Sequence, residues 1–145
     1  MIRVLIADDH YLVRQGIRAL LESAADMEVV GEAGDGKNAL RLVEELDPDV
    51  VVMDISMPKM DGLLATMKLQ ERTSPPHVVM LSMYGNLNLV ERAFRNGASG
   101  YLLKRSTARE LVPAIYSAND GDRFLGSKLP IEARESLLED LSDLS

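Results

Sequence analysis

Five polar side chains stand where chemistry could be done, each at or just after the end of a short apolar run: Asp8, Asp9, Asp54, Ser82 and Lys104. The run before Asp54 is wholly apolar, which is typical of a strand that is buried on both faces. An ionised carboxylate at the edge of an apolar core is costly unless a positive group binds it. Asp54 is therefore a candidate for metal binding, covalent chemistry or both, and the alternative is an Asp that only caps the following turn.

The three carboxylates would need a cation if the fold brought them together. At about 4 Å and an effective dielectric of about 20, two like charges repel by roughly 4 kcal/mol. A hard divalent ion that prefers oxygen ligands, Mg²⁺ above all, would relieve this repulsion. Lys104 and Ser82 could then bind the oxygens of a phosphoryl group, which a carboxylate such as Asp54 can accept covalently. These residue types indicate phosphorylation of Asp54.

The polar residues can meet only if the chain folds as alternating strands and helices. Apolar runs predict five strands, at residues 2–7, 27–33, 49–54, 77–81 and 99–103. Helical spacing predicts five helices, around residues 13–21, 39–46, 62–67, 87–96 and 107–119. Because each parallel crossover needs a dozen or more residues, this alternation predicts an α/β fold with a doubly wound parallel sheet and helices on both faces. In such sheets, ligands bind beyond the carboxyl ends of the strands, where all five polar residues would lie.

The last predicted helix carries two conflicting signals. The stretch 107–110 matches a capping box, which predicts that the helix starts there. Pro113 lies a few residues further on, where its missing N–H would interrupt the helical hydrogen bonds. The helix is therefore expected either to start late, with Pro113 in its first turn, or to be kinked.

Composition excludes several classes of function. The chain has no cysteine, which excludes disulfides, thiolate metal sites and cysteine nucleophiles. No apolar stretch approaches the ~20 residues that span a bilayer, and no signal peptide stands at the N-terminus, so a cytoplasmic location is expected. The net charge of −7, without a basic stripe, argues against a nucleic-acid surface in these residues.

Four segments together resemble the receiver domain of bacterial two-component response regulators: the Asp8-Asp9 pair and the stretches 53–62, 81–82 and 97–104. The resemblance runs from residue 2 to about residue 121 and implies a flavodoxin-like sheet of five strands in the order 2-1-3-4-5. The stretches 47–49 and 101–104 look most like the subfamily with a C-terminal helix-turn-helix (LuxR-type) output domain.

The resemblance implies a role for each acidic residue. Asp54 is the expected phosphoacceptor. Mg²⁺ is expected as the cofactor, on the carboxylates of Asp9 and Asp54, with Asp8 helping through water and the backbone carbonyl of Ser56 as a further ligand. Lys104 is the expected phosphoryl-binding cation.

The resemblance implies that Ser82 and Tyr101 form the switch pair. Together with Lys104, Ser82 is also expected to bind the phosphoryl group. Met83 departs from the family, because a small residue usually follows the switch hydroxyl, and we expect it to alter rates rather than abolish the chemistry. His10 follows the acidic pair and could be a metal ligand or a base, but we interpret it as a residue at the mouth of the site or simply exposed.

By resemblance, the protein is not an enzyme but a phosphoacceptor that assists its own phosphorylation and dephosphorylation. Its expected partner is a sensor histidine kinase, with a possible homodimer on phosphorylation. DNA is expected as a partner only through an output domain that is not present in these residues, and no membrane is involved.

Other classes of function stay open. A Mg²⁺-dependent phosphatase of the haloacid dehalogenase type also uses an Asp at a strand end, but it needs a second Asp two residues later, where this chain has Ser56. An interaction module that works without phosphorylation would not need the complete polar set. A cofactor-binding flavodoxin-like protein would need a phosphate loop rich in Gly, Ser and Thr after the first strand, which is missing.

We divide the chain into a receiver domain at 1–121 and a linker with an amphipathic helix at 122–145. Residues 121–128 read as a break, and Pro130 is placed to start a helix with an apolar stripe. This helix could pack on its own domain, lead to an output domain or make a dimer contact. We expect a chain truncated before an output domain, with a single-domain regulator as the alternative.

Overall fold

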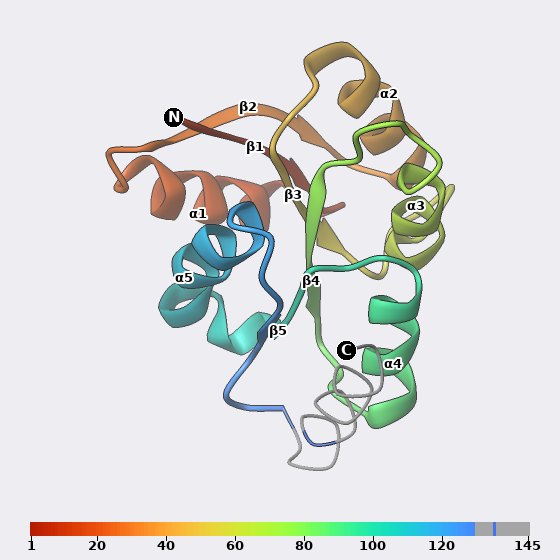
Figure 1. Ribbon diagram of the computed structural model, residues 1–145. Helices are drawn as coiled ribbons and strands as arrows, with labels where there is room; N and C mark the ends of the chain where they lie inside the picture. The colour runs from red at the N-terminus through yellow and green to blue at the C-terminus, as the bar shows by residue number, and fades with distance from the viewer. Residues whose placement is uncertain (130–134, 136–145) are drawn as a thin grey trace.

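The computed structural model describes residues 1–129 and residue 135, and strands and helices alternate along them as the sequence predicts (Figure 1). The strands are β1 (Ile2–Ala7), β2 (Met27–Ala33), β3 (Val50–Asp54), β4 (His77–Ser82), β5 (Gly100–Leu103) and β6 (Phe124–Leu125). The helices are α1 (Tyr11–Glu22), α2 (Gly36–Leu46), α3 (Gly62–Leu69), α4 (Leu87–Arg95) and α5 (Thr107–Asn119), with a short 3-10 helix at Lys104–Ser106. The helix predicted from Pro130 lies outside the described residues.

The sheet is parallel and has the strand order β2-β1-β3-β4-β5-β6. The predicted fold class and the order of the first five strands are confirmed, but the expected count of five is corrected by β6. This strand pairs Phe124 with Gly100, and Phe124 N–H donates to the Ser99 carbonyl at 2.9 Å. A two-residue strand carries no pattern of its own, and β6 falls in the segment that reads as a break. Phe124 and Leu125 thus extend the sheet beyond residue 121, and the domain boundary at that residue stays a prediction.

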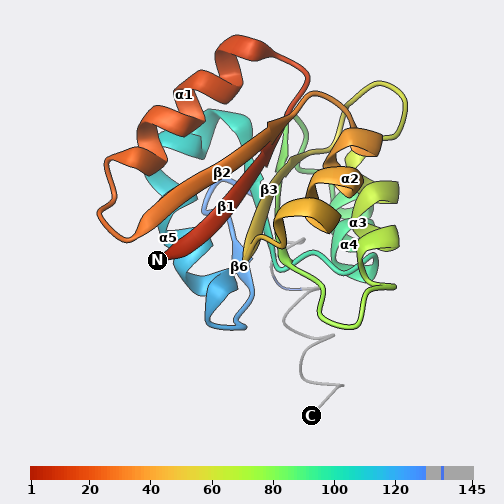
Figure 2. The same cartoon turned by 90° about the horizontal axis from the view of Figure 1, so that it is seen from above.

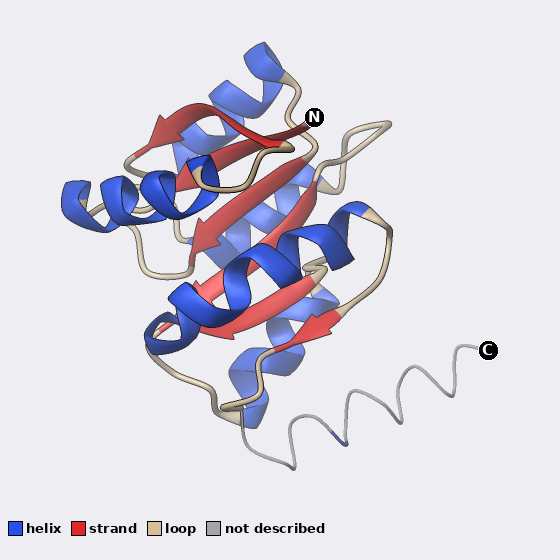
Figure 3. Cartoon of the chain, turned by 90° about the vertical axis from the view of Figure 1, so that its left-hand side faces the viewer, coloured by secondary structure: helices blue, strands red, loops and turns tan. Residues whose placement is uncertain are grey.

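Helices cover both faces of the sheet, with α1 and α5 on one face and α2, α3 and α4 on the other (Figures 2 and 3). Successive side chains of β1 point to opposite faces, so Val4 belongs to the core cluster under α1 and α5, whereas Leu5 belongs to the cluster under the other three helices. All five residues of β3 are buried, as expected for a strand covered on both faces. Asp54 therefore ends a strand at the centre of the molecule.

The buried face of α3 differs from the predicted one. Leu63 is buried, but the side chains of Leu64 and Met67 are 38% and 47% exposed. The helix instead turns Ala65 and Leu69 inward. Apolar residues lie on several sides of this short helix, so their spacing did not single out the buried side. No helix of the described part of the chain is long and apolar enough to cross a membrane.

α5 begins at Thr107, but the predicted capping box does not form. The Thr107 hydroxyl donates to the Lys104 carbonyl at 2.7 Å, and the Glu110 carboxylate accepts hydrogen bonds from Ser127. Pro113 lies well inside the helix, so the interpretation that α5 starts late is wrong. The chain changes direction after β5 within the short 3-10 helix, and α5 therefore begins close to Lys104.

Candidate functional site

The carboxyl edge of the sheet brings the predicted polar residues together. Asp8 directly follows β1, Asp54 ends β3, Ser82 ends β4 and Lys104 follows β5. Parallel register aligns these ends, since Asp54 pairs with Leu81 one residue before Ser82. The fold therefore brings these residues together at one edge of the sheet, as the sequence predicts.

The centre of the site is a lysine between two buried carboxylates. Lys104 Nζ lies 3.1 Å from Asp54 Oδ2 and 3.2 Å from Asp8 Oδ2. Asp8 is 1% exposed and Asp54 is 2% exposed, whereas the Lys104 side chain keeps 18% of its surface in contact with solvent. One ammonium group faces two buried negative charges, so the site has an excess of negative charge.

This imbalance shifts the pKa values of the site. Burial, together with the charge of Asp8, raises the pKa of the Asp54 carboxyl to about 6, although Lys104 and the Ser56 N–H oppose the rise. Burial alone would lower the Lys104 pKa, but the hydrogen bond and charge of Asp54 and the charge of Asp8 outweigh it and raise that pKa. Lys104 is therefore positively charged at neutral pH, and Asp54 holds its negative charge at a cost.

Acidic groups beside this pair could hold a metal ion. One ligand atom from each of Asp8, Asp9, His10 and Asp54 lies within 4.8 Å of the others. Within the described chain, Asp8 Oδ2 and Asp54 Oδ2 are buried oxygens that have no hydrogen-bond donor besides the Lys104 ammonium. Hard carboxylate oxygens with spare negative charge suit Mg²⁺, so the residues present fit the ion that the sequence predicts. The Asp9 side chain is 29% exposed, which leaves this side of the group open to solvent.

A tight loop after β3 places Ser56 next to Asp54. Ser56 N–H donates to Asp54 Oδ1 at 3.3 Å, and Gly62 N–H returns to the Ile55 carbonyl at 2.8 Å. A Cβ at Gly62 would lie 2.2 Å from the Asp54 carbonyl oxygen, so only glycine allows α3 to start this close to β3. Lys59, at φ 68°, completes the reversal of the chain.

The loop is also tied to the start of α2. Gly36 N–H donates to the Met60 carbonyl at 3.1 Å, and a Cβ at Gly36 would lie 2.2 Å from that oxygen. Asp35 caps α2 by accepting from Asn38 N–H at 2.8 Å, and Lys59 Nζ lies 3.7 Å from the same carboxylate. These contacts fix the far side of the loop that carries Ser56.

The predicted switch pair is connected through a residue that the sequence reasoning missed. Ser82 Oγ accepts a hydrogen bond from Tyr84 N–H at 3.0 Å, and the Tyr101 hydroxyl donates to the Tyr84 carbonyl at 2.5 Å. Tyr101 is fully buried, and burial raises the pKa of its hydroxyl. Tyr84 contributes only backbone atoms here, so its residue type carried no signal. Met83, which lies between Ser82 and Tyr84 in the chain, is 68% exposed.

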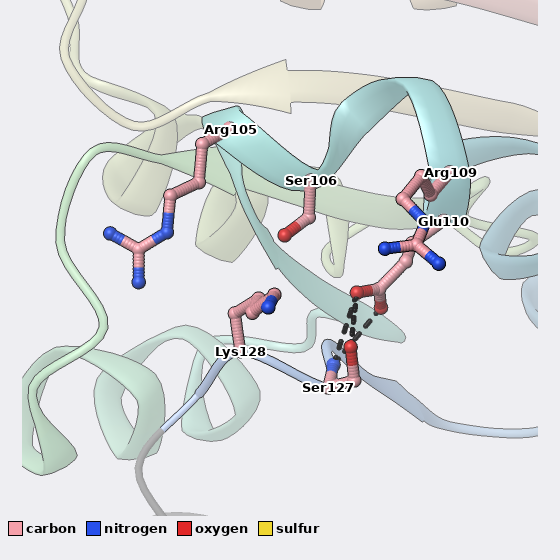
Figure 4. Close-up of a pocket in the computed structure, with 6 residues that line it drawn as sticks. All are labelled: Arg105, Ser106, Arg109, Glu110, Ser127 and Lys128. Atoms are coloured by element: carbon pink, nitrogen blue, oxygen red, sulfur yellow. Dashed lines mark hydrogen bonds between the residues drawn. The ribbon is translucent and has the colours of Figure 1, made fainter.

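An open pocket of about 600 Å³ lies where the chain after β6 crosses the start of α5 (Figure 4). Arg105, Arg109 and Lys128 stand around it, and Glu110 binds both the N–H and the hydroxyl of Ser127. Lys104 does not line this pocket. The carboxylate of Glu110 thus binds the chain after β6 to α5, at a place separate from the acidic site.

The doubly wound sheet, with carboxylates and a lysine at its carboxyl edge, defines a receiver-type domain. Residues 4–116 match the family described as the response regulator receiver domain, and the chain belongs to this family. It is 44% identical over 129 residues to the transcriptional regulatory protein LiaR of Bacillus subtilis (strain 168), an alignment that covers 89% of this chain and 61% of that protein.

Two further similarities extend over most of the chain. The response regulator UvrY of Escherichia coli (strain K12) is 40% identical over 139 residues, which cover 96% of this chain and 64% of that protein. A solved structure of a two-component response regulator of the LuxR family, from Aurantimonas sp. SI85-9A1, matches with a TM-score of 0.87 and 35% identity, over 94% of this chain and 97% of that one. The chain spans about three fifths of the length of LiaR and UvrY.

Proposed function

We propose that this receiver domain accepts a phosphoryl group on Asp54 from a phosphohistidine of a sensor histidine kinase. The observation that carries the proposal is the buried Asp54 carboxylate, 3.1 Å from Lys104 Nζ and beside the buried Asp8. A carboxylate held in this way is poorly neutralised, so a divalent ion improves its surroundings and offsets the negative charge that an incoming phosphoryl group adds.

Mg²⁺ would be held by the carboxylates of Asp9 and Asp54 and by the Ser56 carbonyl, with Asp8 bound through water. When bound, the ion neutralises charge on the carboxylates and on the oxygens of the incoming phosphoryl group. The open side at Asp9 is the side from which the ion and the donor would enter.

In the transfer step, one Asp54 carboxylate oxygen attacks the phosphorus atom. The new O–P bond forms as the N–P bond of the donor breaks, and the electron pair of that bond stays on the histidine nitrogen. Lys104 exchanges its contact with Asp54 for one with a phosphoryl oxygen, because the negative charge has moved there. Ser82 supplies a hydroxyl to another of these oxygens.

The contacts of Ser82 would connect a phosphoryl group on Asp54 to Tyr101. A hydroxyl that donates to phosphate can still accept the Tyr84 N–H, and the Tyr84 carbonyl still accepts from Tyr101. Since Tyr101 is already buried in this conformation, phosphorylation would stabilise its inward position rather than open a new space. A shift from 1:99 to 99:1 between two conformations needs about 5.5 kcal/mol of differential stabilisation.

We further propose that phosphorylation promotes a homodimer and that, in a longer protein, an output domain beyond these residues binds DNA to regulate transcription. The support is the similarity to LiaR, a transcriptional regulatory protein, and to a regulator of the LuxR family. The exposed Met83 beside the site would set the rates of phosphorylation and dephosphorylation by limiting access.

The proposal is tested by incubating the protein with a small phosphodonor and measuring its intact mass, with and without Mg²⁺. The wild type and Asp120→Asn, which changes an exposed Asp at the end of α5, should each gain one phosphoryl group only with Mg²⁺. Asp54→Asn should gain none. Modification of Asp54→Asn at the wild-type rate would show that another residue is the acceptor, and a wild type that is never modified would favour an interaction module that works without phosphorylation.

The role of Lys104 is tested separately. Lys104→Ala should still bind Mg²⁺, because the oxygen ligands remain, but should be phosphorylated slowly, because the phosphoryl oxygens lose their cation. Lys68→Ala, on the exposed side of α3, is the matched control. Equal rates for Lys104→Ala and the control would remove Lys104 from the mechanism.

A further inference from the structure

The acidic group at the carboxyl edge has a nitrogen donor beside it. His10 Nδ1 lies 3.0 Å from Asp9 Oδ1 and 3.4 Å from Asp8 Oδ1. The side chain of His10 is 67% exposed, yet this ring nitrogen is turned toward the carboxylates rather than toward solvent. His10 is also the residue that precedes α1, where its side chain makes no capping hydrogen bond. Its ring therefore has no part in starting the helix.

The backbone around His10 is held firmly in place. His10 N–H donates to Asp8 Oδ1 at 2.8 Å, and its carbonyl accepts from Arg14 N–H at 3.1 Å. The Arg14 guanidinium in turn donates to the Asp8 carbonyl at 2.8 Å. The side chain thus starts from a fixed position at the rim of the acidic group, and only its own two torsion angles set where the ring points.

The distances suit a shared metal ion. Ligands about 2.1 Å from one ion lie roughly 3.0 Å apart when adjacent and roughly 4.2 Å apart when opposite, in octahedral geometry. The separation of His10 Nδ1 from Asp9 Oδ1 matches an adjacent pair. All four candidate ligand atoms, those of Asp8, Asp9, His10 and Asp54, lie within 4.8 Å of one another. A nitrogen and carboxylate oxygens can therefore reach the same ion after small movements.

Mg²⁺ has little use for this nitrogen, because it is a hard ion that prefers oxygen ligands and keeps several waters. Imidazole is instead a good ligand for Co²⁺, Ni²⁺ and Zn²⁺, which bind N and O sites more tightly than the earlier divalent ions of the first row. A site that offers only oxygen ligands would discriminate less strongly between Mg²⁺ and these transition-metal ions.

We propose that His10 Nδ1 is an additional ligand that lets this site bind a divalent transition-metal ion, with Asp9 and Asp54 as the shared oxygen ligands, while Mg²⁺ binds without His10. The inference rests on the proposed function, since both use the same carboxylates. It adds a residue that sets which ion the domain carries when several are present.

The test measures binding of Co²⁺ and of Mg²⁺ by calorimetry at one fixed pH, and the visible absorption of bound Co²⁺, which changes when a nitrogen ligand is lost. His10→Ala should lose at least about tenfold in Co²⁺ affinity and should change the absorption spectrum, with its Mg²⁺ affinity within about twofold of wild type. Urea unfolding of the metal-free variant confirms that it is folded.

His77→Ala is the matched control, because His77 is the other histidine of the chain and opens β4 at the opposite edge of the sheet. It should bind both ions as the wild type does. The inference is overturned if His10→Ala keeps the wild-type affinity and spectrum for Co²⁺, or if its affinity for the two ions falls by the same factor. Those results would leave Mg²⁺-dependent phosphorylation of Asp54 standing, whereas a wild type that binds neither ion would overturn both proposals.

Discussion

Replacing Asp54 by Asn should stabilise the metal-free protein at neutral pH. The Asp54 carboxylate is 2% exposed, and its negative charge adds to that of the buried Asp8, with the single Lys104 ammonium close to both. An amide of nearly the same shape removes one charge without leaving a cavity. The prediction applies in a chelator, since a bound divalent ion would remove the strain on the carboxylate.

The size of the effect follows from the raised pKa of Asp54. Its value of about 6, against an ordinary value of 3.8, means that the folded protein binds more protons than the unfolded chain between about pH 4 and pH 6. Stability therefore falls as pH rises through this window and stays low above it. At about 1.4 kcal/mol per pH unit, the ionised carboxylate costs at most about 3 kcal/mol above pH 6 and almost nothing below pH 4.

Urea unfolding of the wild type and Asp54→Asn in EDTA measures this difference. With a slope of about 2 kcal/mol per molar urea, the midpoint of Asp54→Asn should lie up to about 1.5 M above that of the wild type at pH 8. The two midpoints should converge as the pH falls toward 4. Asp120→Asn, at an exposed position, should follow the wild type throughout. The reasoning fails if Asp54→Asn is no more stable than the wild type at pH 8, or if its advantage is the same at both pH values.

Three further substitutions test the packing around the site by urea unfolding. Gly62→Ala should lose at least about 2 kcal/mol, because its Cβ would lie 2.2 Å from the Asp54 carbonyl oxygen; unchanged stability would mean that α3 can start further from β3. Tyr101→Phe should lose about 1 kcal/mol with the hydrogen bond to the Tyr84 carbonyl, and an unchanged midpoint would show that this bond is not maintained in solution. Leu21→Ala, in the core under α1, should lose about 2–5 kcal/mol, and a loss below 1 kcal/mol would place α1 more loosely on the sheet.

The sequence alone determined the architecture and the position of the site. Alternating apolar runs and helical spacing predict the order of elements, because these patterns are local and each is repeated over many residues. Parallel strands put all their carboxyl ends at one edge, so knowing that Asp8, Asp54 and Lys104 follow strands was enough to predict that they meet. Their residue types then indicated an acidic site with a cation.

Only the tertiary structure decided the contacts that join distant segments. β6 exists because two residues pair with β5, and Tyr84 joins Ser82 to Tyr101 through backbone atoms that any residue type could supply. Glu110 likewise binds Ser127, 17 residues further along the chain, instead of capping its own helix. Such contacts depend on the register between strands and on loop geometry, which single-residue patterns do not encode.

Tertiary contacts also determine the direction in which a surface side chain points. The sequence placed His10 next to the acidic pair and favoured a position at the mouth of the site or simple exposure, without determining where its ring points. The folded chain holds the backbone of His10 between Asp8 and Arg14, and the ring nitrogen then lies 3.0 Å from Asp9. The burial that raises the pKa of Asp54 is likewise a property of the packed core, because it depends on how completely helices cover β3 and not on the residues beside Asp54 in the chain.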